Sequence, residues 1–418
     1  MTATTATLTR LLAWRPGGYL RASGVLFGWL ALRTLAQTAL FLLVARTLGA
    51  QGYGSLIAVM AIATLFAPLV GLGGQSLLVR DGARNPANLT THLGDALRLW
   101  AISVVPLTVL AYLACTLLLP PALPAYAVAA IVLADLAGGS LLDLLARTWQ
   151  AMQRMAGFGA AMAGLILVRL AVFCALLAIA PPSPATWAVW YGAVTAAYVL
   201  LAGGIALRRF GKPRRSDTPF ARLATAGFPF AFAGSAMRIQ AEANKPILAR
   251  LDSIAGAGVY SVAQRVTDLL VLPLQAMLQT LTPRALRAAA PTRTVFALGA
   301  PALALAAGGG LVIAAAAPWL PLLLGASFED AVAATRMLAF LPLLLAVRLL
   351  LGTVMTVRGE QRHFYGAYGL GAAISIAAAA ALVPRFGVTG AAIAAYASEV
   401  ALIAFQGWIL ARPRRMRP

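Results

Sequence analysis

Residues 22–45 read ASGVLFGWLALRTLAQTALFLLVA, an apolar stretch that contains a single charged residue, Arg33. About 20 apolar residues are enough to cross the hydrocarbon core of a bilayer as an α-helix. The stretch is too long for the apolar core of a signal peptide, and no small-residue cleavage site stands out after it. We therefore interpret it as a first membrane-spanning helix that is not cleaved.

The composition of the rest of the chain supports this interpretation. Of 418 residues, 61% are hydrophobic and 11% are charged, whereas soluble domains average about 45–50% apolar and about 25% charged residues. Transmembrane β-strands alternate polar and apolar residues, but the apolar runs here are continuous. The sequence therefore predicts an all-α polytopic membrane protein.

Hydropathy predicts about twelve membrane spans. We expect Pro68 and Gly71 to interrupt the second span, and Pro273 to interrupt the eighth, because membrane helices tolerate such breaks. The predicted spans are 22–45, 53–73, 97–119, 124–143, 157–179, 186–206, 224–248, 256–281, 294–317, 332–357, 364–383 and 389–411.

The basic residues indicate how the spans are oriented. Of 33 Lys and Arg residues, 23 fall in alternate loops and only three, Arg46, Arg250 and Arg385, fall in the opposite loops. Loops rich in Lys and Arg lie in the cytoplasm, so we expect both termini there, which requires an even number of spans. Because the net charge of +21 is spread over span ends rather than one soluble domain, it does not indicate nucleic-acid binding.

Two halves of the chain resemble each other. Ala45-Arg46 recurs as Ala249-Arg250, and Arg33 matches Arg238; five such landmarks have offsets of 204 to 208 residues. A nearly constant offset indicates a duplication of six spans. We expect an N-terminal lobe over 1–207, a basic cytoplasmic linker over 208–222 and a C-terminal lobe over 223–418, with the substrate bound between the lobes.

Seven basic and four acidic residues fall inside the predicted spans. A charge at mid-bilayer costs at least about 2.5 kcal/mol, so such residues face a bundle interior or a water-filled cavity. The seventh span carries three of them at i, i+4 and i+7. The basic residues are Arg33, Arg169, Arg238, Lys245, Arg265, Arg336 and Arg348, and the acidic ones are Asp135, Glu242, Asp268 and Glu399.

These charges allow a structural and a functional interpretation. Arg238 with Glu242, and Arg265 with Asp268, could be internal ion pairs, while Asp135 and Glu399 could pair across the bundle with two of the remaining arginines. Even then three positive charges are left over. A positively charged cavity suits an anionic substrate, and the planar fork of arginine binds phosphate oxygens in pairs.

Other features argue against an enzyme or a metal site. Cys115 and Cys174 lie in apolar runs, and His92 and His363 are far apart, so no metal-ligand set or disulfide framework is indicated. No Walker motif, nucleophile elbow or HExxH motif is present. We expect no cofactor and no catalytic residues.

Several segments resemble a known family. The stretch 43–54 (LVARTLGAQGYG) is similar to the first-loop signature of bacterial polysaccharide-biosynthesis, or O-antigen (Wzx-type), oligosaccharide flippases. Segments that fit the same pattern follow in order at 71–80, 258–265 (GVYSVAQR), 324–325 and 383–391 (VPRFGVTGA). The resemblance covers nearly the whole chain, although each motif is loose.

The resemblance implies a fold and a function. The family belongs to the superfamily of multidrug, oligosaccharidyl-lipid and polysaccharide exporters, with two six-helix, MATE-like lobes around a central cavity and alternating access. Its members carry a polyprenyl-diphosphate-linked oligosaccharide from the cytoplasmic to the periplasmic leaflet of the bacterial inner membrane, for lipopolysaccharide or exopolysaccharide synthesis. The bilayer, a polymerase and glycosyltransferases are the partners implied, and H⁺ or Na⁺ is the implied coupling ion.

We assign the residues of the predicted site on this basis. The predicted substrate-binding residues are Arg33, Gln37, Arg169, Arg238, Lys245, Arg265 and Arg348. The predicted ion-coupling residues are Glu242, Asp268, Asp135 and Glu399. Two alternatives are a cation-coupled multidrug exporter of the same fold, which needs an acidic or aromatic cavity, and a scaffold for polysaccharide synthesis, which has no need of buried charges.

Overall fold

The structure, a computed structural model, describes residues 16–287, 291–360 and 363–412, and within these ranges it contains helices and no strands. The predicted all-α fold is confirmed. Arg10, Arg15, Arg362 and the basic residues of 414–417, which contribute to the predicted orientation, lie outside the described residues.

The described part of the N-terminal half forms seven α-helices, with short 3₁₀ or π segments between some of them. A 3₁₀ turn, Ala67–Leu69, follows α2, and a π-helical segment, Leu133–Gly139, joins α5 to α6. The helices are α2 (Pro16–Phe66), α3 (Gly74–Arg84), α4 (Leu89–Leu118), α5 (Ala125–Val132), α6 (Ser140–Ala151), α7 (Met155–Ile179) and α8 (Pro184–Phe210).

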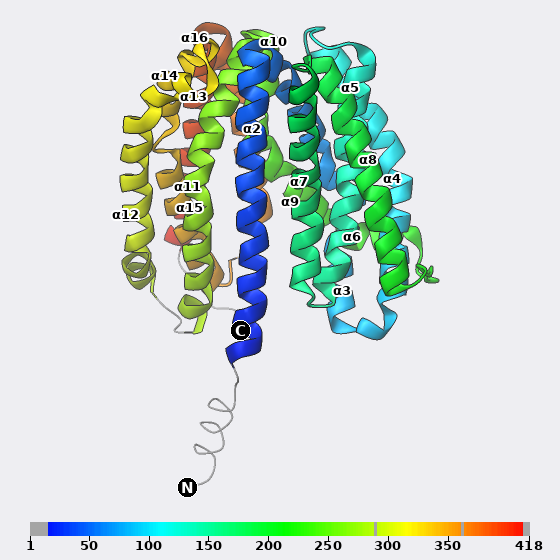
Figure 1. The fold of residues 1–418 in the computed structure, drawn as a ribbon. Coiled ribbons are helices and arrows are strands. Elements are labelled where there is room, and N and C mark those ends of the chain that lie inside the picture. The colour runs from blue at the N-terminus through cyan, green and yellow to red at the C-terminus, as the bar shows by residue number, and fades with distance from the viewer. Residues whose placement is uncertain (1–15, 288–290, 361–362, 413–418) are drawn as a thin grey trace.

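The described residues of the C-terminal half form eight further α-helices. Its helices are α9 (Phe220–Glu242), α10 (Asn244–Leu251), α11 (Ile254–Arg287), α12 (Thr292–Ala316), α13 (Leu320–Leu324), α14 (Asp330–Leu338), α15 (Leu341–Val357) and α16 (Phe364–Ala411). Figure 1 shows α11, α12, α14 and α15 on one side of the molecule and α4 to α8 on the other, with the first part of α2 between them. The predicted lobe boundaries at 207 and 222 stay predictions.

The helices account for twelve passes. Eight helical stretches of the described chain are long and apolar enough to cross a membrane. Two of these, Phe27–Leu69 and Gly366–Ala411, have 43 and 46 residues and bend at Gly49 (φ 65°) and Gly387 (φ 51°); each is therefore long enough for two passes. The pair α9–α10 and helix α11, which carry the charges of the predicted seventh and eighth spans, supply the other two.

The two predicted proline breaks have different outcomes. The helix ends before Pro68, where Ala67–Leu69 forms a 3₁₀ turn and residues 70–73 lead into α3. The break predicted at Pro273 is wrong, because α11 continues through it from Ile254 to Arg287. A membrane helix can continue through a proline where local adjustments and neighbouring helices satisfy the freed backbone groups.

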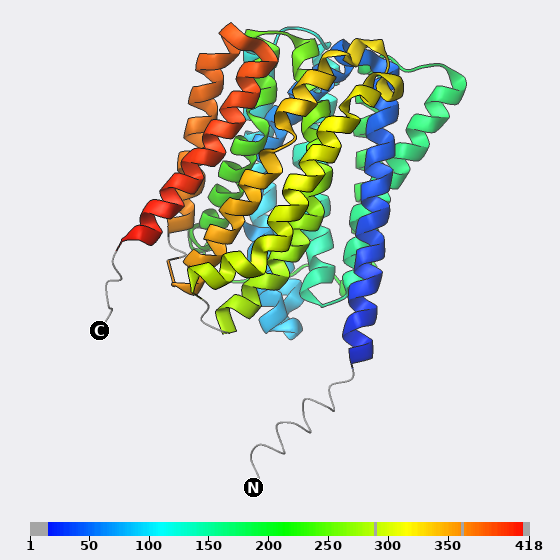
Figure 2. The ribbon, with the colours of Figure 1, turned by 90° about the vertical axis from the view of Figure 1, so that its left-hand side faces the viewer.

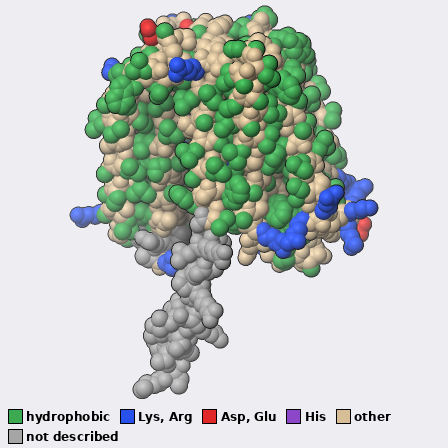
Figure 3. All heavy atoms as spheres, viewed as in Figure 1, with side chains coloured by type: hydrophobic (Ala, Val, Ile, Leu, Met, Phe, Trp, Pro, Cys, Tyr) green, Lys and Arg blue, Asp and Glu red, His purple; other side chains and the backbone are tan. Residues whose placement is uncertain are grey.

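The described chain begins and ends at the same end of the bundle. Figure 2 shows the first turn of α2 and the last turn of α16 both at the lower end, which agrees with an even number of passes. In Figure 3, hydrophobic side chains cover the middle of the face shown, and many of its Lys and Arg side chains gather near the lower end. The cytoplasmic placement of that end stays a prediction.

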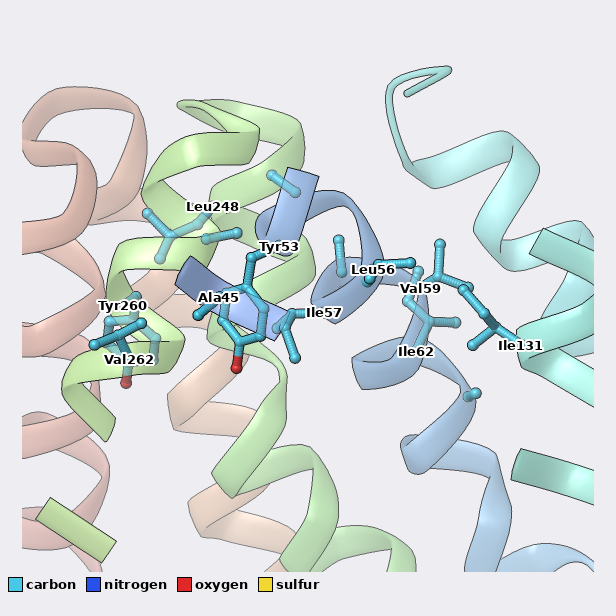
Figure 4. Close-up of a cluster of buried hydrophobic side chains, with 14 of the residues drawn as sticks. Ala45, Tyr53, Leu56, Ile57, Val59, Ile62, Ile131, Leu248, Tyr260 and Val262 are labelled. Carbon is cyan, nitrogen blue, oxygen red and sulfur yellow. The ribbon is translucent and has the colours of Figure 1, made fainter. Parts of the chain in front are cut away.

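The hydrophobic core differs between the two ends. Near the upper end, one buried cluster contains residues from α2, α4, α5, α8, α10, α11, α14 and α16, and therefore joins both halves. Figure 4 shows Tyr53, Leu56 and Ile57 of α2 between Leu248 and Tyr260 on one side and Ile131 on the other. Toward the lower end the clusters are separate, with α11, α12 and α15 in one and α3, α4 and α6 in another.

Two glycines allow the halves to meet closely near the upper end. A Cβ atom on Gly54 of α2 would lie 1.9 Å from the carbonyl oxygen of Ile254, and one on Gly258 of α11 would lie 2.4 Å from that of Ala50. The hydroxyls of Tyr53 and Ser261 lie 3.4 Å apart beside this crossing. We call the contact of Gly54 with Gly258 the glycine crossing.

Candidate functional site

The first and seventh passes place two arginines between the halves. Arg33 of α2 is half-buried and interacts electrostatically with Arg238 of α9 and with Asp143 of α6. Asp143 also forms an ion pair with Arg147, at 3.2 Å. Two like charges held close to each other repel, so an anion bound near them would relieve the repulsion. Gln37, one turn beyond Arg33, is exposed.

The charges at the end of the seventh pass are arranged differently from the prediction. The predicted pair of Arg238 with Glu242 is not formed; Glu242 instead bonds to Lys245, which is only 6% exposed. The cause is local, because Pro246 has no N–H to continue the helix and α9 ends at Glu242 before α10 begins. Lys245 is therefore neutralised within its own pass, while Arg238 stays exposed.

Arg265 and Asp268 of α11 complete the charged region. The two residues interact electrostatically, but within the described residues no ion pair joins them. The guanidinium of Arg265 lies over the ring of Phe41 of α2, 5.1 Å from its centroid, and its buried Nε has no hydrogen-bond partner in the described part of the chain. A buried donor without a protein partner is available to a water molecule or a ligand.

We call the six charged residues contributed by α2, α9, α10 and α11 the central cluster. It contains four basic and two acidic side chains, and one of each is engaged in the pair of Glu242 with Lys245. The electrostatic interactions of Asp268 extend to three other members of the cluster. The members are Arg33, Arg238, Glu242, Lys245, Arg265 and Asp268.

A second group of polar residues is buried inside the N-terminal half. Arg169 of α7 is 7% exposed; it donates to the hydroxyl of Thr195 at 2.6 Å and lies over the ring of Tyr191, 3.6 Å from its centroid. The hydroxyl of Tyr191 donates to the carboxylate of Asp135 at 2.6 Å. Asp135 thus shares a network with Arg169, away from the central cluster, on a π-helical segment of a kind often found at functional sites.

The C-terminal half contains an equivalent buried pair. Arg348 of α15 donates to the carboxylate of Glu399 of α16 at 2.7 Å, and the amide of Gln240 of α9 donates to the other carboxylate oxygen at 3.0 Å. This confirms the expected pairing of Glu399 with an arginine across the bundle. The pair lines a pocket of about 200 Å³, to which Asp268 of the central cluster also contributes.

The structure divides ten of the eleven predicted site residues among three places. The central cluster contains six of them, the network in the N-terminal half contains Arg169 and Asp135, and the pocket contains Arg348 and Glu399. Gln37, the eleventh, is exposed and belongs to none of these places. The roles of these residues in binding and coupling stay predictions. Sequence reasoning missed Asp143, Tyr191, Thr195 and Gln240. The i, i+4 spacing of Tyr191 and Thr195 on one apolar helix was the available signal for two of them.

The chain matches a family model described as polysaccharide biosynthesis protein, over residues 20–288. No curated protein sequence matches the chain significantly.

Solved structures of low sequence identity share the fold. The inward-facing conformation of a multidrug resistance MATE family transporter of the MOP superfamily has a TM-score of 0.67 and 17% identity, covering 90% of this chain and 93% of that chain. The outward-facing conformation of such a transporter has a TM-score of 0.61 and 16% identity, covering 94% of each chain. A MOP superfamily transporter from Pyrococcus furiosus, described as having a binding pocket of reverse polarity that suggests a different function, has a TM-score of 0.62 and 14% identity, covering 94% of this chain and 95% of that chain.

Proposed function

Since the chain belongs to the polysaccharide biosynthesis protein family, we propose that it carries a polyprenyl-diphosphate-linked oligosaccharide across the bacterial inner membrane, from the cytoplasmic to the periplasmic leaflet. The observation that carries the proposal is the placement of Arg33 and Arg238. The two charges come from different halves of the chain and lie close enough to interact electrostatically, so a diphosphate bound between the halves would interact with both.

The charge balance of the central cluster supports an anionic substrate. With Glu242 bonded to Lys245, and Asp268 as the second acid among three further arginines, the cluster keeps a positive surplus. Arginine suits a diphosphate, because its planar fork matches phosphate oxygens and its charge is retained at any physiological pH. The buried Nε of Arg265, which has no partner among the described residues, offers the substrate one further hydrogen-bond donor.

The arrangement of the core supports alternating access. The halves share a core near the upper end and have separate cores toward the lower end, which is the shape expected of a transporter closed on one side of the membrane. In the proposed cycle the glycine crossing opens and the lower ends of the two halves approach each other. Proton or sodium binding is the proposed driving force, and Glu242, Asp268, Asp135 and Glu399 are the proposed coupling residues.

Charge removal in a deletion strain of the native host tests the proposal. Arg33→Ala and Arg238→Ala should each reduce surface polysaccharide at least about tenfold, because each removes one charged contact to the diphosphate and a tenfold loss corresponds to about 1.4 kcal/mol. The polysaccharide would be measured by gel and lectin staining, and membrane levels by immunoblot. Arg336→Ala is the matched control, because Arg336 is exposed and, among the described residues, bonds only the carbonyl of Ala314 at 3.3 Å.

Two outcomes would contradict the proposal. The first is normal polysaccharide in both variants at normal membrane levels. The second is normal polysaccharide in the deletion strain together with broad sensitivity to cationic drugs, which would identify the multidrug exporter instead.

A further inference from the structure

The pocket inside the C-terminal half has the properties of a binding site. Four helices line it: Gln240 lies on α9, Gln264 and Asp268 on α11, Arg348 on α15, and Tyr368 and Glu399 on α16. Its volume of about 200 Å³ exceeds several times the roughly 30 Å³ that one water molecule occupies in the liquid. The pocket therefore has room for a polar group of several heavy atoms next to Arg348.

In the structure, the partner of Arg348 is a residue of the protein itself. Glu399 is only 8% exposed. One of its carboxylate oxygens accepts a hydrogen bond from Nε of Arg348 at 2.7 Å, and the other accepts one from the amide of Gln240 at 3.0 Å. Both carboxylate oxygens are therefore engaged, whereas the pocket lies open beside the pair. An anion with two oxygens in the same plane would meet the same donors as the carboxylate, because carboxylate and phosphate oxygens match arginine in the same way.

We propose that Glu399 is a built-in substitute for the phosphate of the substrate and competes with it for Arg348. When the pocket contains no substrate, Glu399 compensates the charge of Arg348. When a phosphate group enters, Arg348 exchanges one oxyanion for the other. This inference rests on the proposed function, since it takes a phosphate-bearing substrate as the ligand.

The other charged and titratable groups around the pair are few. Within the described residues, α11 contributes Asp268 and Tyr260 to the pocket, α16 contributes Tyr368 beside Glu399, and α9 contributes the neutral Gln240. On α10, Lys245 is bonded to Glu242. Asp268 interacts electrostatically with Arg265, Lys245 and Glu242, so it connects the pocket to the central cluster.

Binding of farnesyl diphosphate to the purified protein in detergent tests the proposal. Glu399→Gln removes the competing charge and keeps the size of the side chain, so this variant should bind farnesyl diphosphate at least about tenfold more tightly than the unmodified protein at pH 7.5. Both proteins are compared at the same pH, so the charge of the probe is the same in the two measurements.

A further variant and a second probe test whether the gain in affinity depends on Arg348 and on the diphosphate. Glu399→Gln combined with Arg348→Gln should lose the gain, because the arginine that would bind the phosphate is then absent. Farnesol, which lacks the diphosphate, should not distinguish the variants. If Glu399→Gln does not fold, Glu399→Ala, which also removes the charge, should show the same gain in affinity for farnesyl diphosphate.

The proposal is overturned if Glu399→Gln binds farnesyl diphosphate no more tightly than the unmodified protein, if the double variant keeps the gain, or if no variant binds the probe. Failure of the proposed function is a separate result. Normal polysaccharide in Arg33→Ala and Arg238→Ala cells, together with tighter binding by Glu399→Gln, would mean that the cargo is a different phosphate-bearing molecule.

Discussion

At the scale of single residues, the hydroxyl of Tyr191 connects the buried charges of the N-terminal half. It donates to Asp135 at 2.6 Å while its ring lies under the guanidinium of Arg169. Tyr191→Phe keeps the ring but leaves the carboxylate without this donor, and a lost hydrogen bond to a buried charged group costs about 1.5–3 kcal/mol. The variant should unfold at a lower temperature in detergent. Tyr126→Phe, at a position 62% exposed, should not change it, and equal midpoints for the two variants would contradict the assigned role.

The same residues show what could be predicted from the sequence at this scale. Asp135, Arg169, Arg348 and Glu399 were recognisable because a charge in an apolar run is costly. Their neutral partners were not recognisable, because placing a tyrosine, threonine or glutamine in a membrane span costs much less free energy than placing a charge there. The distance between partners in the chain is a second reason: Gln240 and Glu399 are 159 residues apart, and only the packing of α9 against α16 brings them together.

At the scale of helices, the glycine crossing lets α2 and α11 meet backbone to backbone. A methyl group at Gly54 would lie 1.9 Å from the Ile254 carbonyl oxygen, so Gly54→Ala must separate the two helices. Ser261, which is completely buried at this contact, then becomes accessible. We expect a cysteine placed there, in a Cys174→Ser background that removes the exposed native thiol, to react faster with a maleimide in the Gly54→Ala variant.

Gly308 supplies the control for this prediction. A Cβ atom at Gly308 of α12 would meet nothing within 4 Å, so Gly308→Ala should leave the labelling rate unchanged and should favour the helix by up to about 1 kcal/mol. An unchanged labelling rate in Gly54→Ala would mean that α2 and α11 are not tightly packed at the glycine crossing.

The apolar passes could be predicted from the sequence, whereas the positions at which helices break or change type could not. Hydropathy was sufficient for the apolar passes, where burial in lipid dominates the free energy. It did not predict the break between α9 and α10, which follows from the single residue Pro246, or the π-helical segment at Asp135, which inserts one extra residue per turn without a composition signal. Pro273 shows the opposite error, because α11 tolerates it.

At the scale of the whole molecule, the orientation in the membrane determines the direction of transport. The structure is closed near the upper end, and the described chain begins and ends at the lower end. The excess of Lys and Arg in alternate loops predicts that this lower end is cytoplasmic. If so, the structure is an inward-facing state, and its central cluster is accessible from the leaflet where a lipid-linked precursor would be made.

Reporter fusions test this orientation directly. A fluorescent protein fused after Ala411 should fluoresce, and alkaline phosphatase at the same position should be inactive, because both would lie in the cytoplasm. Phosphatase fused after Leu119, in a loop that follows three predicted spans, should be active in the periplasm. Only three basic residues were found in the loops of that side, against 23 on the other, and this asymmetry is strong enough to set orientation on its own. An active phosphatase after Ala411 would reverse the orientation, place the closed end in the cytoplasm and make the structure an outward-facing state.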